Sequence, residues 1–321
     1  MKPILELKDV VMEFEIEILG ARKRVRAVDR VSLVIDRGSV YGLVGESGSG
    51  KTTLGKVSLR LYRPSAGVVM FDGVDITKLP ERRLRPLRRR MQLIPQDPYS
   101  AINPLHTIGE ALMEPLMIHY GLERREALDR VLEMLGRVGL VPPEEFVNRK
   151  PNQLSGGQLQ RAVIARAMLL NPDYVVADEP TSNLDASIRA SIIDLLLEFR
   201  REYGQSLLFI THDISLVSLI ADRVGVMYLG QLIEEGPTDQ LIKEPLHPYT
   251  QALISAVPLS GELGYRKVTL KGEIGDPATP PPGCRFHPRC PFAMDICKRQ
   301  EPPVVEVRPG IFVKCWLYVR K

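Results

Sequence analysis

The pattern of apolar and polar positions divides the first 45 residues into strands. The stretch "MKPILELKDVVMEFEIEI" alternates apolar and charged residues, and "VRAVDRVSLVIDRGSVYGLVG" continues this alternation until it reaches a glycine. A period of two is typical of strands that bury one face. We therefore expect two antiparallel strands followed by a third strand.

Helical and extended patterns alternate after this point. "GESGSGKTTLGKVSLRL" opens a helix, and "GVVMFDGVDI" returns to strand with Asp72-Gly73 as a hairpin turn. From about Asp97 to Asn171 the apolar residues are spaced mainly by three and four, as in "EALDRVLEMLGRVGL". This spacing predicts a helical subdomain over about residues 97–171.

The strands "DYVVADE" and "QSLLFITH" flank the helix "SIRASIIDLLLEFRREYG", and "RVGVMYLGQLIEEG" is typical of a closing hairpin. Apolar strands joined by a helix predict a parallel sheet that is covered on both faces. Prolines accumulate past Pro245, and "GDPATPPPGC" predicts an extended linker. We expect a core domain over residues 1–255 and a small accessory region over residues 256–321.

Composition narrows the class of protein. Hydrophobic content of 44% and charged content of 26% are ordinary for a soluble globular protein. A net charge of +4 and 6% aromatic residues fall short of a nucleic-acid-binding composition. The start of the chain lacks the pattern of a signal peptide, and its apolar runs are too short to cross a bilayer. We expect a cytosolic protein whose membrane role, if it has one, depends on a partner.

The segment "GESGSGKT" fits the phosphate-binding pattern G-x-x-x-x-G-K-[ST] between an apolar strand and a helix. Glycines let backbone N–H groups surround phosphate oxygens, and the helix N-terminus adds partial positive charge. Lys51 would hold the β- and γ-phosphates, and the Thr52 hydroxyl would bind Mg²⁺. The alternative is a plain glycine turn. The candidate residues are Gly45, Glu46, Ser47, Gly48, Ser49, Gly50, Lys51, Thr52 and Thr53.

An acidic pair ends the apolar strand "YVVADE". Strand polarity delivers Asp178 to the carboxyl edge of the sheet, where it would hold Mg²⁺ through water. Glu179 would polarise the attacking water. An isolated acidic pair of this kind would more often be a solvated strand end, but here a phosphate-binding loop precedes it in the chain.

The stretch "LSGGQLQRAVIARAMLLNPDYVVADEPTSNLD" makes the sequence resemble the ATP-binding cassette (ABC) family over nearly all of residues 1–255. The resemblance assigns five further features in the family's order. These are an adenine-stacking aromatic at Phe14, a Q-loop at Gln96, a signature at Leu154, Ser155, Gly156, Gly157 and Gln158, a D-loop at Ser182, Asn183, Leu184 and Asp185, and a switch histidine at His212.

This resemblance implies the fold and the mechanism. The fold is an α/β P-loop NTPase cassette: a RecA-like parallel-sheet core with an antiparallel β subdomain and a helical subdomain. Two cassettes would enclose two ATP molecules, with Ser155 of one facing a phosphate held by the other. Gln96 would reach the Mg²⁺ ion and the attacking water, and His212 would act with Glu179 in hydrolysis. Asn183 departs from the alanine that is usual in importers, which we expect to alter contacts across the pair.

The stretches "IPQDPYSAINPLHTIGEALMEPL" and "EPLHPYTQALISAVP" resemble the oligopeptide/dipeptide importer branch of this family. That branch implies transmembrane permease subunits, a second ATPase subunit (a paralogue or an identical copy) and an extracytoplasmic solute-binding protein. Tyr99 to Met113 is the candidate permease contact. The arginine-rich run from Arg82 to Arg90 is interpreted as a solvated helix face rather than a nucleic-acid or lipid site.

All four cysteines lie near the carboxyl end, at Cys284, Cys290, Cys297 and Cys315. A reducing cytosol disfavours disulfides, and four thiolates suit Zn²⁺ or an iron–sulfur cluster. The wide gaps favour a cluster, whereas His287 midway between the first two cysteines keeps a mixed zinc site open. Members of the importer branch with a carboxyl-terminal [4Fe–4S] cluster favour the cluster further. We expect a metal-ligating accessory region that metal helps to fold.

The sequence thus predicts an ATP-hydrolysing importer subunit that is peripheral on the cytoplasmic face of the cell membrane and uses ATP, Mg²⁺ and a [4Fe–4S] cluster, with Zn²⁺ as the alternative. Peptides are the expected solutes. The same role in oligosaccharide or nickel uptake, or a soluble ABC ATPase acting on ribosomes or nucleic acid, remain the alternatives.

Overall fold

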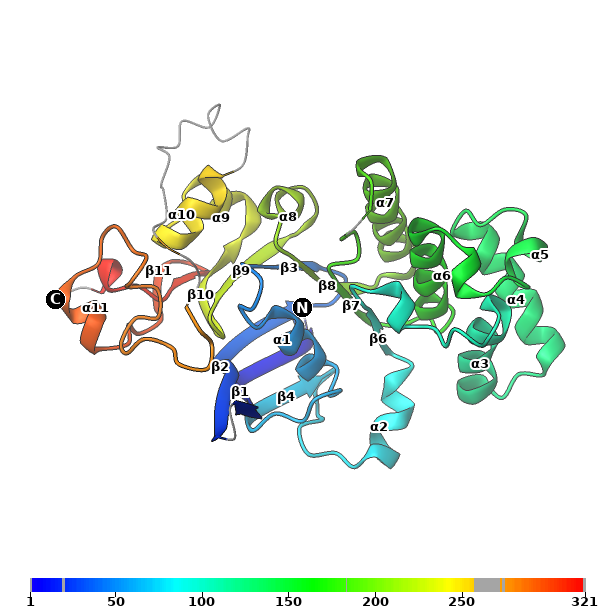
Figure 1. Cartoon of the computed structure of the whole chain (residues 1–321), viewed down its shortest axis with the longest axis horizontal. Coiled ribbons are helices and arrows are strands. Elements are labelled where there is room, and N and C mark those ends of the chain that lie inside the picture. Colours follow the sequence, from blue (N-terminus) through cyan, green and yellow to red (C-terminus); the bar gives the residue numbers. More distant parts are fainter. Residues whose placement is uncertain (1, 19–20, 183, 257–271, 273–274, 320–321) are drawn as a thin grey trace. The chain divides into compact units, whose positions relative to one another are not determined.

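The chain forms two compact units in the computed structural model (Figure 1). One unit comprises Met1–Lys78 and Leu208–Lys321, and the other comprises Leu79–Leu207. Each unit is described separately below. The structure describes residues 2–18, 21–182, 184–256, 272 and 275–319.

The first unit contains a four-stranded antiparallel sheet in the order β2-β1-β4-β5. The alternating sequence has its expected effect, since Leu5 and Leu7 are buried whereas Lys8 is exposed. Asp72 and Gly73 both adopt positive φ angles of 50° and 77°, as the predicted hairpin turn requires. The strands are β1 (Pro3–Ile18), β2 (Ala21–Asp36), β4 (Ala66–Phe71) and β5 (Val74–Asp75).

A second sheet in this unit has strands in the order β11-β12-β10-β9-β3-β8. Every position of β3 and of β8 is buried, which explains why both strands are continuous apolar runs. Strands β3 and β9 are parallel, whereas β9 and β10 form the predicted antiparallel hairpin. The strands are β3 (Val40–Val44), β8 (Ser206–Thr211), β9 (Arg223–Tyr228), β10 (Gln231–Pro237), β11 (Val305–Arg308) and β12 (Ile311–Val313).

Short helices accompany these sheets. Helix α1 follows β3 directly, and α9 and α10 follow β10 (Figure 1). The segment after residue 275 returns to β10, because β12 pairs with it at Glu234 and Glu235. The helices of this unit are α1 (Lys51–Ser58), α8 (Ile214–Ile220), α9 (Thr238–Lys243), α10 (Pro248–Ser255), α11 (Asp295–Arg299) and the 3₁₀ turn η4 (Trp316–Tyr318).

The second unit is mainly helical, as its apolar spacing predicts (Figure 1). Leu112, Val131 and Ile164 are fully buried among its helices, and the parallel strands β6 and β7 complete it. Its elements are α2 (Glu81–Arg88), β6 (Met91–Ile94), η1 (Pro98–Ser100), α3 (Ile108–Tyr120), α4 (Arg124–Arg137), α5 (Pro143–Phe146), η2 (Pro151–Gln153), α6 (Gly156–Met168), β7 (Tyr174–Asp178) and α7 (Ala186–Tyr203).

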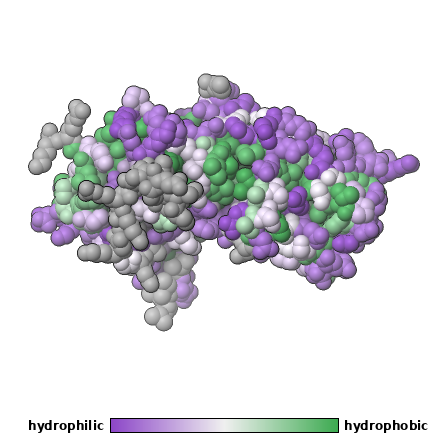
Figure 2. All heavy atoms as spheres, turned by 90° about the horizontal axis from the view of Figure 1, so that it is seen from above, coloured by the Kyte–Doolittle hydropathy of each residue, from purple (hydrophilic) through white to green (hydrophobic). Residues whose placement is uncertain are grey.

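The surface mixes polar and apolar side chains. Hydrophilic residues cover much of the face in Figure 2, with small apolar groups between them. Leu105 in the second unit is 76% exposed, and Leu219 in the first unit is 82% exposed. None of the helices in the described ranges combines the length and the apolar character that a bilayer crossing requires.

Candidate functional site

The predicted phosphate-binding loop joins β3 to α1 in the first unit. Gly45 has a φ angle of 155° and Gly50 has a φ angle of 102°, a backbone conformation that L side chains rarely adopt. A Cβ atom at Gly50 would lie 2.2 Å from the Ala27 carbonyl oxygen, and one at Gly45 would lie 2.3 Å from that of Met227. Both positions therefore require glycine, because neighbouring backbone closes around the loop.

Lys51 is the first residue of α1, and its side chain is almost completely buried by the loop. Its ammonium group donates to the carbonyl oxygens of Gly45 at 2.8 Å and Glu46 at 3.0 Å, and to Ser49 Oγ at 3.4 Å. The loop thus holds the charge at its centre, at a helix N-terminus. A cation and a helix dipole placed together are suited to bind phosphate. Thr52 and Thr53 are half-buried on the first turn.

In the second unit, Asp178 ends β7 and Glu179 follows it with a φ angle of 44°. One carboxylate oxygen of Glu179 accepts hydrogen bonds from Ser182 Oγ at 2.7 Å and from Gln96 Nε2 at 3.3 Å. The side chains of the predicted Q-loop and D-loop therefore meet at one carboxylate. Asp178 is 4% exposed.

The predicted signature forms the start of α6. Ser155 caps the helix, since its Oγ accepts from the Gln158 amide at 3.3 Å while Gln158 Oε1 accepts from the Ser155 amide at 3.0 Å. Beyond this cap, Gly157 lies against α7, because a Cβ atom there would be 2.8 Å from Ile188 Cγ2. A Cβ atom at Gly156 would be 3.8 Å from Leu184 Cδ2, so signature and D-loop are neighbours in the same unit. Asn183 lies outside the described residues.

Comparisons with known proteins agree with this arrangement. The family described as "ABC transporter" matches residues 28–182, and the family described as "Oligopeptide/dipeptide transporter, C-terminal region" matches residues 233–297. The oligopeptide transport ATP-binding protein AppF of Bacillus subtilis is 47% identical over 98% of this chain and 97% of its own. This chain belongs to the oligopeptide/dipeptide family of ABC transporter ATP-binding subunits.

Other relatives and solved structures support the same assignment. A putative peptide import ATP-binding protein of Brucella ovis is 48% identical over 91% of this chain and 92% of its own. The dimeric ATP-binding cassette MJ0796, in a post-hydrolysis state with ADP and Pi, has a TM-score of 0.66 at 32% identity and covers 73% of this chain and 98% of that one. ABC cassettes hydrolyse ATP with Mg²⁺, so the predicted α/β cassette fold of the core, the enzyme class and the family are confirmed.

Two further predicted site residues, His212 and Phe14, lie outside the phosphate-binding loop and the signature. His212 is exposed immediately after β8, where the side chain of Asp213 caps α8 by accepting from the amides of Ser215 and Leu216. Phe14 is half-buried on β1 and packs edge to face against Tyr62 with ring centroids 5.4 Å apart.

The metal-ligating region predicted for this ABC subunit is not supported. No three His, Cys, Asp or Glu side chains within the described ranges are grouped as they would be around a metal ion. The four thiols are nevertheless close enough to interact. Burial and, to a smaller extent, the other three thiols raise the pKa of Cys315 to about 12. The prediction rested on residue type, on the spacing of the cysteines and on the family resemblance, whereas ligation also requires the thiols to converge on one point. The predicted ligands were Cys284, Cys290, Cys297 and Cys315.

Aromatic contacts that were not predicted from the sequence hold the cysteine region in place. Phe286 is 1% exposed, with its ring 5.3 Å from that of Tyr228 and 5.5 Å from that of Tyr249. The ring of His247 lies 5.3 Å from that of Phe286, and burial lowers the pKa of His247 to about 3, which keeps it neutral. The signal that could have been noticed is the apolar Phe286 between two arginines, inside a stretch we interpreted only as ligands.

Proposed function

We propose that the chain couples ATP hydrolysis to the import of oligopeptides or dipeptides. The observation that carries this proposal is the similarity of almost the whole chain to named oligopeptide transport ATP-binding proteins, including the carboxyl-terminal region. The carboxyl-terminal match matters most, because many ABC cassettes lack such a region.

Within the nucleotide site, we assign Lys51 to the β- and γ-phosphates and Thr52 to Mg²⁺. Asp178 would hold the same ion through water, and Gln96 would contact both ion and water. The support for Lys51 is its position at the centre of the loop, where three oxygen atoms orient its ammonium group. Phe14 would stack on the adenine ring, and its side chain is only partly buried.

We assign Glu179 as the general base that takes a proton from the attacking water. Its carboxylate is oriented by Gln96 and Ser182, and its left-handed backbone is uncommon for a residue with a side chain. His212 would assist by donating to the γ-phosphate.

We also propose that two cassettes act together, with Ser155, Gly156 and Gly157 of each facing the nucleotide of the other. The solved MJ0796 relatives are dimeric, which supports pairing of this type. The start of α6 supports a phosphate contact, because the N–H groups of a helix's first turn have no acceptor within the helix and face out of its N-terminal end. The second cassette would be a paralogue or an identical copy.

The permease contact would lie on residues 99–113 of the second unit. Tyr99 is 51% exposed and Leu105 is 76% exposed, so both side chains are accessible to a partner. A permease helix docked here would hold the subunit on the cytoplasmic face of the membrane. A solute-binding protein on the other face would deliver the cargo to the permease.

Reconstitution tests this assignment. The chain, its co-purifying transmembrane subunits and their solute receptor would be placed in liposomes containing Mg²⁺-ATP, and uptake of labelled tripeptides, disaccharides and Ni²⁺ would be compared. We expect peptides alone to accumulate and to raise the rate of ATP hydrolysis. Uptake restricted to the sugar or the metal, or co-purification with ribosomes instead of permease helices, would contradict the proposal.

We further propose that the four cysteines hold a [4Fe–4S] cluster after a local rearrangement that draws the thiols together. The support is chemical. Burial is the main cause that raises the pKa of Cys284, Cys290 and Cys315, and neighbouring thiols also raise it, while the backbone N–H groups of Phe286, Phe292 and Leu317 act in the opposite direction and lower it. Such donors stabilise the thiolates that ligate iron.

Metal analysis of protein purified without oxygen tests the cluster. We expect a brown protein with visible absorbance and about four irons per chain, and loss of the colour in a variant with Cys297 and Cys315 replaced by serine. A variant with Ser191 and Ser218 replaced by alanine serves as the matched control and should keep its colour. Colourless protein with stoichiometric zinc, or with no metal, would end the cluster assignment.

A further inference from the structure

The segment from Cys284 to Cys290 makes a direct contact with the phosphate-binding loop. Arg289 donates from Nη1 to Glu46 Oε2 at 2.6 Å and from Nη2 to Glu46 Oε1 at 3.0 Å. This is a two-point guanidinium–carboxylate pair, and the Arg289 side chain is 9% exposed. Glu46 is the second residue of the loop, so an arginine next to Cys290 holds the loop from 243 positions along the chain.

Glu46 is fixed at its backbone as well. Its amide donates to the Tyr249 hydroxyl at 2.8 Å, and its carbonyl oxygen accepts from Lys51 Nζ at 3.0 Å. Tyr249 is fully buried and packs against Phe286, which belongs to the same segment as Arg289. The side chain, the amide and the carbonyl oxygen of Glu46 therefore each have a partner. Arg289 of the cysteine segment binds the side chain, and Tyr249, which packs on that segment, binds the amide.

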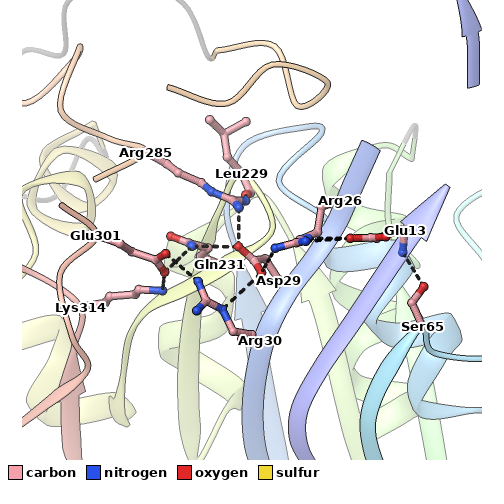
Figure 3. A network of polar contacts seen from close by, with 10 residues as sticks. All are labelled: Glu13, Arg26, Asp29, Arg30, Ser65, Leu229, Gln231, Arg285, Glu301 and Lys314. Carbon is pink, nitrogen blue, oxygen red and sulfur yellow. Dashed lines mark hydrogen bonds and ion pairs between the residues drawn. The ribbon is translucent and has the colours of Figure 1, made fainter. Parts of the chain in front are cut away.

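A second connection passes through the turn between β9 and β10. Arg285 donates to the carbonyl oxygen of Leu229 and pairs with the carboxylate of Asp29, as Figure 3 shows. The amide of the next residue, Gly230, donates to the carbonyl oxygen of Ser49 in the phosphate-binding loop at 2.8 Å. Arg285 thus supports the loop indirectly, at Ser49, whereas Arg289 binds Glu46 of the loop directly.

Asp29 anchors this second connection. It is 2% exposed and also accepts hydrogen bonds from Arg26 at 3.1 Å and Gln231 at 3.2 Å (Figure 3). Burial alone would raise the pKa of Asp29, but Arg285 and its other partners lower it, so the carboxylate stays ionised and keeps its partners. A buried charge paired in this way defines one geometry, because any displacement would leave it unpaired.

We propose that Arg289 and Arg285 make the cysteine segment a positioning element of the nucleotide site, so that ATP binding and the order of this segment are coupled. Two physical effects act together. The Arg289 guanidinium offsets the Glu46 charge, which would otherwise repel the phosphates of ATP within the same loop. The two arginines also hold the loop in the shape that Lys51 requires.

Coupling of this kind is reciprocal, since a segment that favours ATP binding must itself be stabilised by ATP. It extends the nucleotide role given to the loop under the proposed function. The two are separable, because unsubstituted protein that fails to bind ATP would refute the nucleotide role. If the unsubstituted protein binds ATP and replacing the arginines does not change that binding, only the coupling would be refuted.

Arg289→Ala is the test, in the full chain with its permease. We expect the KM for ATP to rise roughly tenfold with kcat changed less than about twofold. Adding Glu46→Gln should recover most of the lost affinity, since it removes the unpaired charge. Arg308→Ala, which removes an exposed ion pair with Glu244 in the same unit, is the matched control and should leave KM unchanged. An unaltered KM in Arg289→Ala, or an equal rise in the control, would overturn the proposal.

A second measurement needs no substitution and applies even if Arg289→Ala fails to fold. Amide hydrogen exchange of residues 284–290 would be followed in the unsubstituted protein with and without saturating MgADP. We expect exchange to slow at least about threefold when the nucleotide is bound. Equal exchange in both conditions would overturn the coupling.

Discussion

Glu179→Gln should bind ATP and pair with a second cassette, but turn ATP over roughly 1000-fold more slowly than the unsubstituted protein. The amide has the size of the carboxylate and can still accept hydrogen bonds from Gln96 and Ser182. It cannot take a proton from water at neutral pH. The geometry of the site is therefore kept while its chemistry is removed.

Phosphate release at saturating Mg²⁺-ATP, together with equilibrium binding of ATP, measures this effect. Glu198→Gln on the exposed side of α7 is the control and should retain full turnover, because the two substitutions change the net charge equally. Undiminished hydrolysis in Glu179→Gln would remove Glu179 from the mechanism. Loss of binding would show that the residue supports the structure of the site instead.

Lys51→Met should lose ATP binding itself, with Kd rising at least roughly 100-fold, or about 2.7 kcal/mol. Methionine keeps the length and most of the apolar surface of lysine but provides neither a charge nor a donor. The oxygen atoms of Gly45, Glu46 and Ser49 would lose the ammonium group that they surround. The negative phosphates would lose their nearest cation.

Equilibrium dialysis with labelled ATP separates this outcome from the first, since Glu179→Gln keeps the nucleotide and Lys51→Met does not. Lys243→Met, in the exposed last turn of α9, controls for the loss of a lysine. If Lys51→Met bound ATP as tightly as the control, the loop would not be the phosphate site.

Local patterns in the sequence predicted the elements that local forces specify. The buried strands β3, β7 and β8 are short apolar runs between glycines, helices and turns, and the helical subdomain follows its apolar spacing. Strands β6, β11 and β12 were missed. Each has only three or four residues. Strands β6 and β12 pair with strands far away in the sequence, and β11 pairs with β12 next to it.

The nucleotide motifs were predictable because each one is contiguous in the sequence. The contacts between motifs were not predictable. Glu46 meets Arg289 across 243 positions, and Gly157 meets Ile188 through the packing of two helices. A residue's type indicates what it could bind, but only the folded chain determines which partner it contacts. For this reason the sequence predicted a role for the cysteines but none for the arginines beside them.

The pairing of β12 with β10 has a consequence for how the folded protein avoids self-association. Strand β10 has seven residues, four of them buried, and without β12 its outer row of amides and carbonyls would be open to another chain. With β12 and β11 added, the outermost strand has only four residues, and Glu306 and Arg308 on it are exposed. The carboxyl-terminal segment thus covers the edge of β10 and leaves a short, charged edge strand in its place. Such an edge disfavours pairing with strands of other molecules.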